Sequence, residues 1–232
     1  MPVRLILDTD FFSDVDDAGA LALLNALQGR GEARILAVMV NTPGRWGAPA
    51  VDAVNTYYHH GGIPVGTLKP NDDSDHSYAK YLAQHFPNSL KDGVRAPDAV
   101  ALYRQVLARQ PDRSVVIASV GYLTNLSNLL DSPPDRHSRR SGRELVARKV
   151  KELVVMGGAY PSGREWNFSQ DPAAARNVVD RWPTRQVFSG FEVGADVYTG
   201  ARLATTPEGN PVRKAYELYP GTTPEGGRSS WD

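Results

Sequence analysis

Five aspartates fall within ten residues near the start of the chain, namely Asp8, Asp10, Asp14, Asp16 and Asp17. An apolar run precedes the first of them, and a helical pattern of apolar residues follows the last. Two like charges about 4 Å apart repel by roughly 4 kcal/mol at an effective dielectric constant of about 20, so such a loop must extend into water, take up protons or bind a cation. Oxygen ligands at this density suit a hard cation, Ca²⁺ or Mg²⁺.

A structural explanation competes with a metal site in this acidic loop. Asp8 would be a hydrogen-bonded acid at a strand end, while Asp16 and Asp17 would cap the helix and complement its dipole. Capping accounts for one or two of the acids, which favours the metal site. An EF-hand needs glycine at its sixth position and glutamate at its twelfth, but counting from Asp8 these positions hold Ser13 and Gly19.

The composition limits the classes of partner. The 26 basic and 26 acidic residues cancel, and no basic stripe indicates nucleic acid or an anionic membrane as a partner. The absence of cysteine excludes disulfides and thiolate ligands. The first residues lack the pattern of a signal peptide, and no run approaches the roughly 18 apolar residues of a membrane span. We expect a cytoplasmic protein that binds a small molecule.

Apolar runs alternate with helical patterns along the chain. The predicted strands span residues 5–7, 33–40, 64–66, 114–119, 152–156 and 186–189. The predicted helices span residues 18–27, 50–58, 97–107, 123–129 and a segment that starts at Asp171-Pro172. Residues 131–142 read as a surface loop, and no strong core element is visible beyond residue 205.

This alternation predicts one α/β domain over residues 1–232, with an open, mostly parallel, Rossmann-like sheet and helices on both faces. Ligands bind outside the carboxyl ends of the strands in such sheets. Polar or glycine residues follow four of the predicted strands, at Asp8 and Asp10, at Asn41, at residues 119–121 and at residues 157–158. We therefore expect these strand ends to form one rim, with the polar stretch 71–77 as a loop on the same side.

Together these segments resemble the nucleoside hydrolase family. The family's Asp-x-Asp followed by Asp-Asp-Ala matches Asp8, Asp10, Asp16, Asp17 and Ala18, in a loop two residues longer than the shortest family form. Further matches occur in family order at Asn41, at residues 119–125 (Ser-Val-Gly-Tyr-Leu-Thr-Asn), at residues 155–159 (Val-Met-Gly-Gly-Ala), at residues 165–167 with Asp171-Pro172, and at residues 230–232 (Ser-Trp-Asp).

The resemblance implies a Ca²⁺-dependent hydrolase that cleaves the N-glycosidic bond of ribonucleosides or related glycosides, and a homodimer or homotetramer. The implied Ca²⁺ ligands are the side chains of Asp10, Asp17 and Asp232 and the backbone carbonyl of Val120. The implied ribose ligands are Asp16, Asn41, Glu165 and Asn167. The cleavage passes through an oxocarbenium-like transition state, which needs a water on one face of the sugar. Because Ca²⁺ polarises water less than Zn²⁺ does, a base is needed, and Asp10 is the candidate general base on a metal-bound water.

Two features depart from the family pattern. Trp231 stands where many members have a histidine before the final aspartate, so the acid that protonates the leaving base is unassigned. The loop between Met156 and Glu165 is short. Asp14 is the surplus acid, and we expect it either to stabilise the loop or to support the metal ligands, rather than to bind the ion itself. Because a metal ligand cannot fray, an Asp232 at the last position suggests a shortened chain that lacks C-terminal helices.

Two other functional classes stay open at this point. A haloacid-dehalogenase-like Mg²⁺ phosphatase also opens with a strand and Asp-x-Asp, and it would use Asp8 as nucleophile with Lys149 or Lys151 downstream. A non-catalytic relative that binds ribose or a nucleoside would explain Trp231. Phosphate release would favour the first alternative, and binding without product would favour the second.

Overall fold

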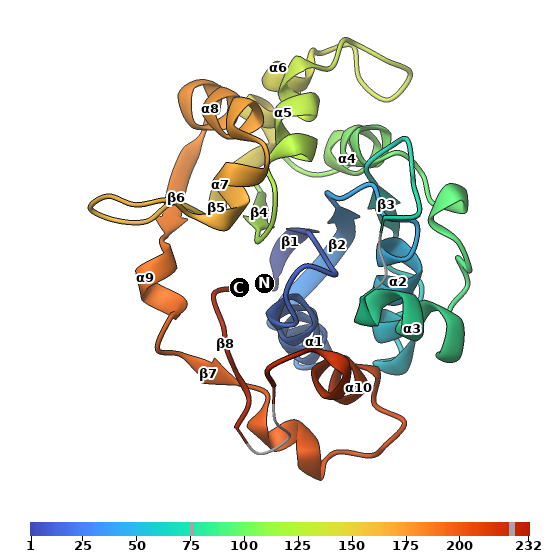
Figure 1. Cartoon of the computed structure of the whole chain (residues 1–232). Coiled ribbons are helices and arrows are strands. Elements are labelled where there is room, and N and C mark those ends of the chain that lie inside the picture. Colours follow the sequence, from blue (N-terminus) through green and yellow to red (C-terminus); the bar gives the residue numbers. More distant parts are fainter. Residues whose placement is uncertain (75–76, 223–225) are drawn as a thin grey trace.

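The computed structural model describes residues 1–74, 77–222 and 226–232. Its centre is a parallel sheet of six strands in the order β3-β2-β1-β4-β5-β6 (Figure 1). The strands are β1 (Val3–Thr9), β2 (Ala33–Val40), β3 (Val65–Thr67), β4 (Val115–Ser119), β5 (Val150–Met156) and β6 (Arg185–Ser189). All six predicted strands are present, and the predicted parallel α/β fold is confirmed.

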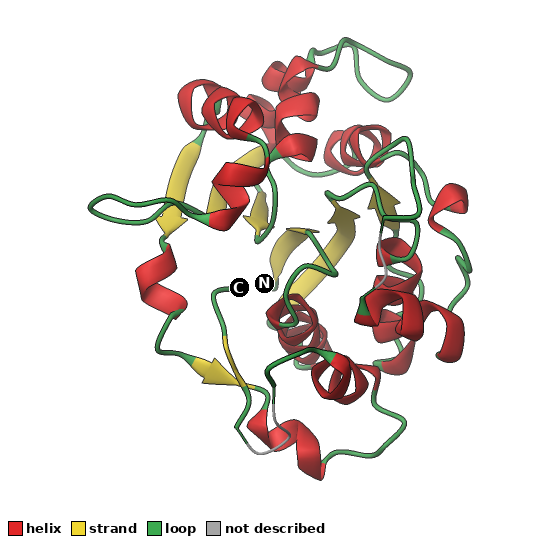
Figure 2. Ribbon diagram, in the orientation of Figure 1, coloured by secondary structure: helices red, strands yellow, loops and turns green. Residues whose placement is uncertain are grey.

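Helices cover both faces of this sheet (Figure 2). One layer consists of α1 (Asp16–Gly29), α2 (Gly47–Tyr57), α3 (Tyr78–His85) and α10 (Pro211–Leu218). The other layer consists of α4 (Ala99–Ala108), α5 (Thr124–Asp131), α6 (Gly142–Lys149) and α8 (Pro172–Arg181). Alternate residues of β1 serve the two layers, because Ile6 belongs to the core under α4 and α5 whereas Leu7 belongs to the core under α1 and α2.

The remaining short elements lie in the connections. They are η1 (Gly93–Arg95), α7 (Trp166–Gln170), α9 (Phe191–Gly194), η2 (Ala201–Thr205), and the antiparallel pair β7 (Tyr198–Thr199) and β8 (Arg228–Ser229). Residues 75 and 76 of the predicted loop 71–77 are outside the described part of the chain. No helix of the described residues is both long enough and apolar enough to cross a membrane.

Polar caps explain where several helices begin. Asp171 accepts a hydrogen bond from the backbone N–H of Ala174 at 3.0 Å, with a proline at the first helical position, as predicted. The helix expected from residue 97 begins at Ala99, because Asp98 takes the cap position. The expectation of no core element beyond residue 205 is wrong: α10 is capped by Asn210 and buries one side against α1 and α3.

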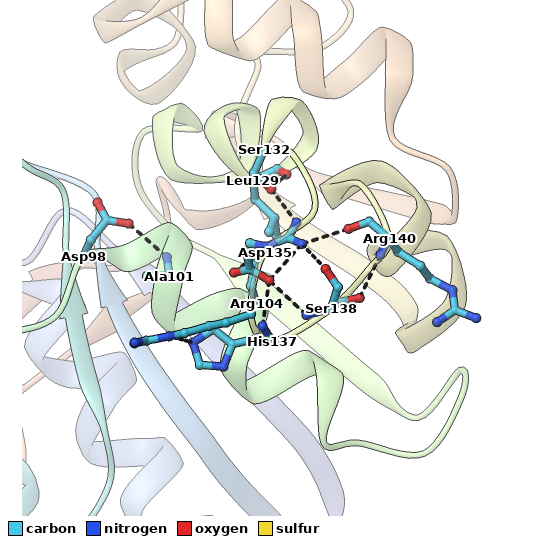
Figure 3. A network of polar contacts seen from close by, with 10 residues as sticks. Asp98, Ala101, Arg104, Leu129, Ser132, Asp135, His137, Ser138 and Arg140 are labelled. Carbon is cyan, nitrogen blue, oxygen red and sulfur yellow. Dashed lines mark hydrogen bonds and ion pairs between the residues drawn. The ribbon is translucent and has the colours of Figure 1, made fainter.

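The predicted surface loop 131–142 is anchored to α4 by one nearly buried guanidinium (Figure 3). Arg104 donates hydrogen bonds to the Ser132 hydroxyl at 2.8 Å and to the Arg140 carbonyl at 2.8 Å, and it forms an ion pair with Asp135. The hydrogen bond from Arg104 is the main reason why the pKa of Asp135 falls to about 2. The loop is therefore fixed to the helical layer rather than free in solvent.

The strand order creates a crevice beside β1. The chain runs outward through β2 and β3, returns to the other side of β1 at β4, and then continues outward through β5 and β6. The carboxyl ends of β1 and β4 therefore flank the topological switch point, where open α/β sheets bind their ligands. Asp8 and Ser119 are paired at this end of the two strands.

Candidate active site

A cavity of about 330 Å³ lies at this edge of the sheet. Its walls come from the acidic loop after β1, the ends of β4 and β5, the first turn of α7 and the C-terminal segment after β8. Seven of the eight site residues predicted from the sequence line it, namely Asp10, Asp16, Asp17, Val120, Glu165, Asn167 and Asp232. The eighth, Asn41, is fully buried in the protein.

Three aspartates form a group within this cavity. One carboxylate oxygen each of Asp16, Asp17 and Asp232 lies within 4.8 Å of the others. Asp17 is fully buried, and its Oδ1 accepts a hydrogen bond from the Thr9 hydroxyl, while its Oδ2 has no hydrogen-bond partner among the described residues. Burial and the neighbouring carboxylates raise the pKa of Asp17 and of Asp232 well above the usual range. An unpartnered buried oxygen among three acids is the arrangement that a hard cation would satisfy.

Asp10 lies beside this group rather than within it. The structure places Asp16 with Asp17 and Asp232, whereas the resemblance implied Asp10 in that position. The Asp10 carboxylate accepts a hydrogen bond from the Ser13 hydroxyl, and burial raises its pKa to about 7. It still faces the same cavity as the three acids.

Helix capping does not explain the acids of the first turn of α1. The cap position is occupied by Val15, which makes no side-chain cap hydrogen bond. Asp16 instead accepts a hydrogen bond from the backbone N–H of Trp231 at 2.8 Å. Asp17 is held by Thr9 of β1. Both carboxylates are therefore directed toward the site, and the capping explanation for them is wrong.

Asp8 and Asn41 form a buried support beneath the cavity. Asp8 accepts hydrogen bonds from the Tyr103 hydroxyl at 2.6 Å and from Asn41 Nδ2 at 2.7 Å, and burial raises its pKa to about 7. The Asn41 Oδ1 accepts a hydrogen bond from the backbone N–H of Tyr122 at 3.2 Å. Asn41 thus joins the end of β1 to the turn after β4. A fully enclosed Asp8 cannot act as the nucleophile that the phosphatase alternative requires.

Glu165 and Asn167 fix the far wall of the cavity. Glu165 caps α7 by accepting hydrogen bonds from the backbone N–H groups of Asn167 at 2.6 Å and Phe168 at 3.0 Å. Asn167 Nδ2 donates to the backbone carbonyls of Val120 at 3.3 Å and Met156 at 3.2 Å. These bonds tie α7 to the ends of β4 and β5, and they place the Val120 carbonyl beside the cavity.

Comparison with known sequences decides the family. The profile of the inosine-uridine preferring nucleoside hydrolase family matches residues 5–222. The chain belongs to this family. The resemblance found in the sequence motifs is thereby confirmed, and the position of Asp8 agrees with it rather than with the phosphatase alternative.

Individual nucleoside hydrolases are distant from this chain. The pyrimidine-specific ribonucleoside hydrolase RihA of Salmonella newport is 33% identical over 121 residues, which are 49% of this chain and 35% of that protein. The inosine-uridine preferring nucleoside hydrolase of Leishmania major is 26% identical over 237 residues, which cover 92% of this chain and 67% of that protein. The match with RihA thus spans about a third of its length.

Solved structures share the fold. The effector protein XOO4466 superposes with a TM-score of 0.76 at 20% identity, over 94% of this chain and 65% of that one. The purine-preferring ribonucleoside hydrolase from Gardnerella vaginalis superposes with a TM-score of 0.64 at 20% identity, over 97% of this chain and 76% of that one. This member of the nucleoside hydrolase family therefore has the same α/β fold as these two proteins.

A second cavity of about 620 Å³ adjoins the acidic one in this family member. The two cavities share Ser13, Trp166 and Tyr219 in their walls. Aromatic side chains dominate the second cavity, and they are Phe12, Tyr78, Tyr81, Tyr122, Trp166 and Tyr219. An acidic compartment therefore opens beside an aromatic one.

Sequence reasoning missed several residues of this site. Arg228, Tyr219 and Phe191 line the acidic cavity, but they come from connections without a periodic pattern. Arg228 forms an ion pair with Asp14, which agrees with the expectation that Asp14 supports the loop. The density of glycine and proline around Arg228 concealed this contact, because no helical or strand pattern pointed to it.

Proposed function

We propose that this protein hydrolyses the N-glycosidic bond of a nucleoside or a related N-glycoside, releasing the base and the sugar, with Ca²⁺ as cofactor. The observation that supports this most directly is the unpartnered buried Oδ2 of Asp17 in a group with Asp16 and Asp232 at the switch point of the sheet. The family membership of the chain supports the same reaction.

The donor set fits a hard divalent cation. The side chains of Asp16, Asp17 and Asp232 would hold the ion, with Asp10 and the carbonyl of Val120 in the same cavity. Oxygen ligands alone favour Ca²⁺ or Mg²⁺ over the softer transition metals. When bound, the ion would neutralise the clustered carboxylates and orient a water for attack.

The protein's own groups divide the remaining work. Asp10 faces the cavity in an orientation fixed by Ser13, and it takes the proton from the water that attacks the anomeric carbon. Glu165 and Asn167 line the same space and bind sugar hydroxyls there. Both side chains are already oriented by hydrogen bonds to backbone groups. The substrate therefore has to order them little when it binds.

The aromatic cavity suits the other half of the substrate. A planar base gains from contact with aromatic faces, whereas the polar sugar suits the acidic compartment. Histidine is absent from the described lining of both cavities, so a tyrosine is the better donor toward the leaving base. The hydroxyls of Tyr78 and Tyr219 already donate to backbone carbonyls. Tyr122 lies in the wall of the aromatic cavity, and its hydroxyl donates no hydrogen bond to another described residue, which leaves its proton for the base.

One assay tests this function. Free base should be detected by chromatography from at least one member of a panel of ribonucleosides, and a chelator should suppress it. Asp10→Asn should abolish base release while the fold and Ca²⁺ binding largely persist, whereas Asp180→Asn, an exposed aspartate on α8, should behave as the wild type. Binding of nucleosides without any product would instead support the non-catalytic alternative, and full turnover by Asp10→Asn would exclude Asp10 as the base.

A further inference from the structure

The last residues of the chain cross the acidic cavity as a strap, which we define as residues 226–232. Its strand β8 pairs with β7, and the backbone N–H of Ser230 donates to the carbonyl of Val197 at 2.8 Å. The backbone N–H of Trp231 donates to Asp16, and its indole donates to the carbonyl of Phe191 at 2.9 Å. In Figure 1 the strap runs from β8 toward α1, and it ends at Asp232 in the group of three acids.

A forked ion pair fastens the strap to the acidic loop. Arg228 Nε lies 3.1 Å from Asp14 Oδ1, and Arg228 Nη2 lies 2.6 Å from Asp14 Oδ2. Two parallel charge-assisted bonds of this kind fix the orientation as well as the distance. The guanidinium carbon also lies 5.4 Å from the ring centre of Tyr219 and 5.6 Å from that of Trp231. Arg228 is thus held by the fork to Asp14 and by its contacts with two aromatic rings.

The charges around the strap explain why it needs such a contact. The strap carries Asp232 into a cavity that already contains Asp16 and Asp17, so without a cation the carboxylates repel it. Among the described residues that line this cavity, Arg228 is the sole cation. Asp14 is not a member of the three-acid group, although it lies in the acidic loop that leads to Asp16 and Asp17. The surplus acid of the loop is therefore paired with the cation of the strap.

We propose that Asp14 and Arg228 are positioning residues that hold the strap against the acidic loop and thereby place Asp232 among the cation ligands. This inference rests on the proposed function for its cation. Neither residue belongs to the three-acid group that would hold the ion, so both act through Asp232. The strap and the acidic loop, at opposite ends of the sequence, then form one binding unit.

The sign of one substitution separates positioning from simple electrostatics. Arg228 is a positive charge beside a cation site, so its removal would strengthen Ca²⁺ binding if only its charge mattered. If Arg228 positions Asp232, its removal must weaken Ca²⁺ binding despite the gain in negative charge. Arg228→Gln keeps a polar side chain of similar length and removes the fork.

Calorimetric titration of the ion-free full chain with CaCl₂ measures this effect. We expect Arg228→Gln and Asp14→Asn each to weaken Ca²⁺ binding by about 10- to 100-fold, as loss of groups that orient metal ligands usually does. The double variant should bind Ca²⁺ with about the same affinity as the single variant that has the lower affinity, because the two side chains act as one contact. The control Arg181→Gln removes the ion pair with Asp131 on the surface, and it should bind Ca²⁺ as the wild type does. Wild-type or tighter binding by Arg228→Gln would overturn the proposal.

Amide hydrogen exchange in the presence of a chelator tests the strap without any metal. The amides of residues 228–231 should exchange faster in Arg228→Gln than in the wild type and in Arg181→Gln, while those of the strands β1 and β4 stay protected. Equal exchange of the strap in all three proteins would refute the positioning role. A wild-type protein that binds no Ca²⁺ would contradict the proposed cofactor, and the exchange result would then still decide whether Asp14 and Arg228 fasten the strap.

Discussion

Calcium should stabilise the fold more strongly at about pH 7.5 than at about pH 5.5, because protons compete with the ion for the buried acids. Burial raises the pKa of Asp10 from 3.8 to about 7. Between these values the folded chain keeps a proton that the unfolded chain has released, so the free energy of unfolding of the ion-free protein falls as the pH rises. The ion would displace that proton and remove this loss of stability.

The size of the effect follows from the same shift. Each proton displaced adds about 1.4 kcal/mol per pH unit to the stabilisation by Ca²⁺, so a rise of about two units adds roughly 2 to 3 kcal/mol for Asp10 alone. In a domain of this size that corresponds to an extra rise in Tm of roughly 5 to 10 °C. The pKa of Asp8 is also raised to about 7 by burial, but Asp8 lies beneath the cavity and contributes equally with and without the ion.

Thermal unfolding at the two pH values, with excess Ca²⁺ and with a chelator, measures this difference. The variant Asp10→Asn is the control, since it lacks the carboxyl that titrates and should show a smaller change of the Ca²⁺ effect with pH. A Tm shift by Ca²⁺ that is equal at both pH values, or larger at the lower one, would refute the reasoning. So would an ion-free wild type that becomes more stable as the pH rises through this window.

Three substitutions test the support and the chemistry of the site. Tyr103→Phe should lower the free energy of unfolding in urea by about 1 to 3 kcal/mol, because Asp8 loses one of its buried donors. Gly121→Ala should reduce both Ca²⁺ affinity in calorimetry and base release, because the added Cβ would lie 2.5 Å from the backbone nitrogen of Asp10. Tyr122→Phe should lower kcat for base release by about a hundredfold with little change in KM, and an unchanged kcat would remove Tyr122 as the donor to the leaving base.

The sheet could be predicted from the sequence because its strands are buried on both faces. Runs such as 33–40 are almost entirely apolar, and this pattern has few other interpretations in a chain with alternating helices. The end of the chain was harder, since α10 is short and lies between segments rich in glycine and proline. Its Asn210-Pro211 start was the available signal, because asparagine caps helices and proline favours their first position.

The sequence predicted which residues belong to the site more readily than how their side chains are arranged. The order of motifs led to seven residues that line one cavity, but a sequence does not reveal which way each side chain points. Asn41 is the clearest case, because an asparagine after a strand reads the same whether it faces a ligand or binds a buried acid such as Asp8. The pairing of Asp14 with Arg228 is a contact over 214 residues, and no local pattern encodes it.

The strap and the acidic loop are separated by more than 200 residues in the sequence, and this separation affects the order in which the protein folds during synthesis. The backbone N–H of Trp231 binds Asp16, which lies 215 residues earlier in the sequence. The strand β1 has a neighbour on its second side only after β4 has been synthesised. A nascent chain can therefore assemble its strands and helical layers while the acids of the first loop still repel one another. In the proposed arrangement the cation site is complete only once residues 228–232 have been synthesised, so a nascent chain that stops before Asp232 would yield a folded sheet with an unfinished site.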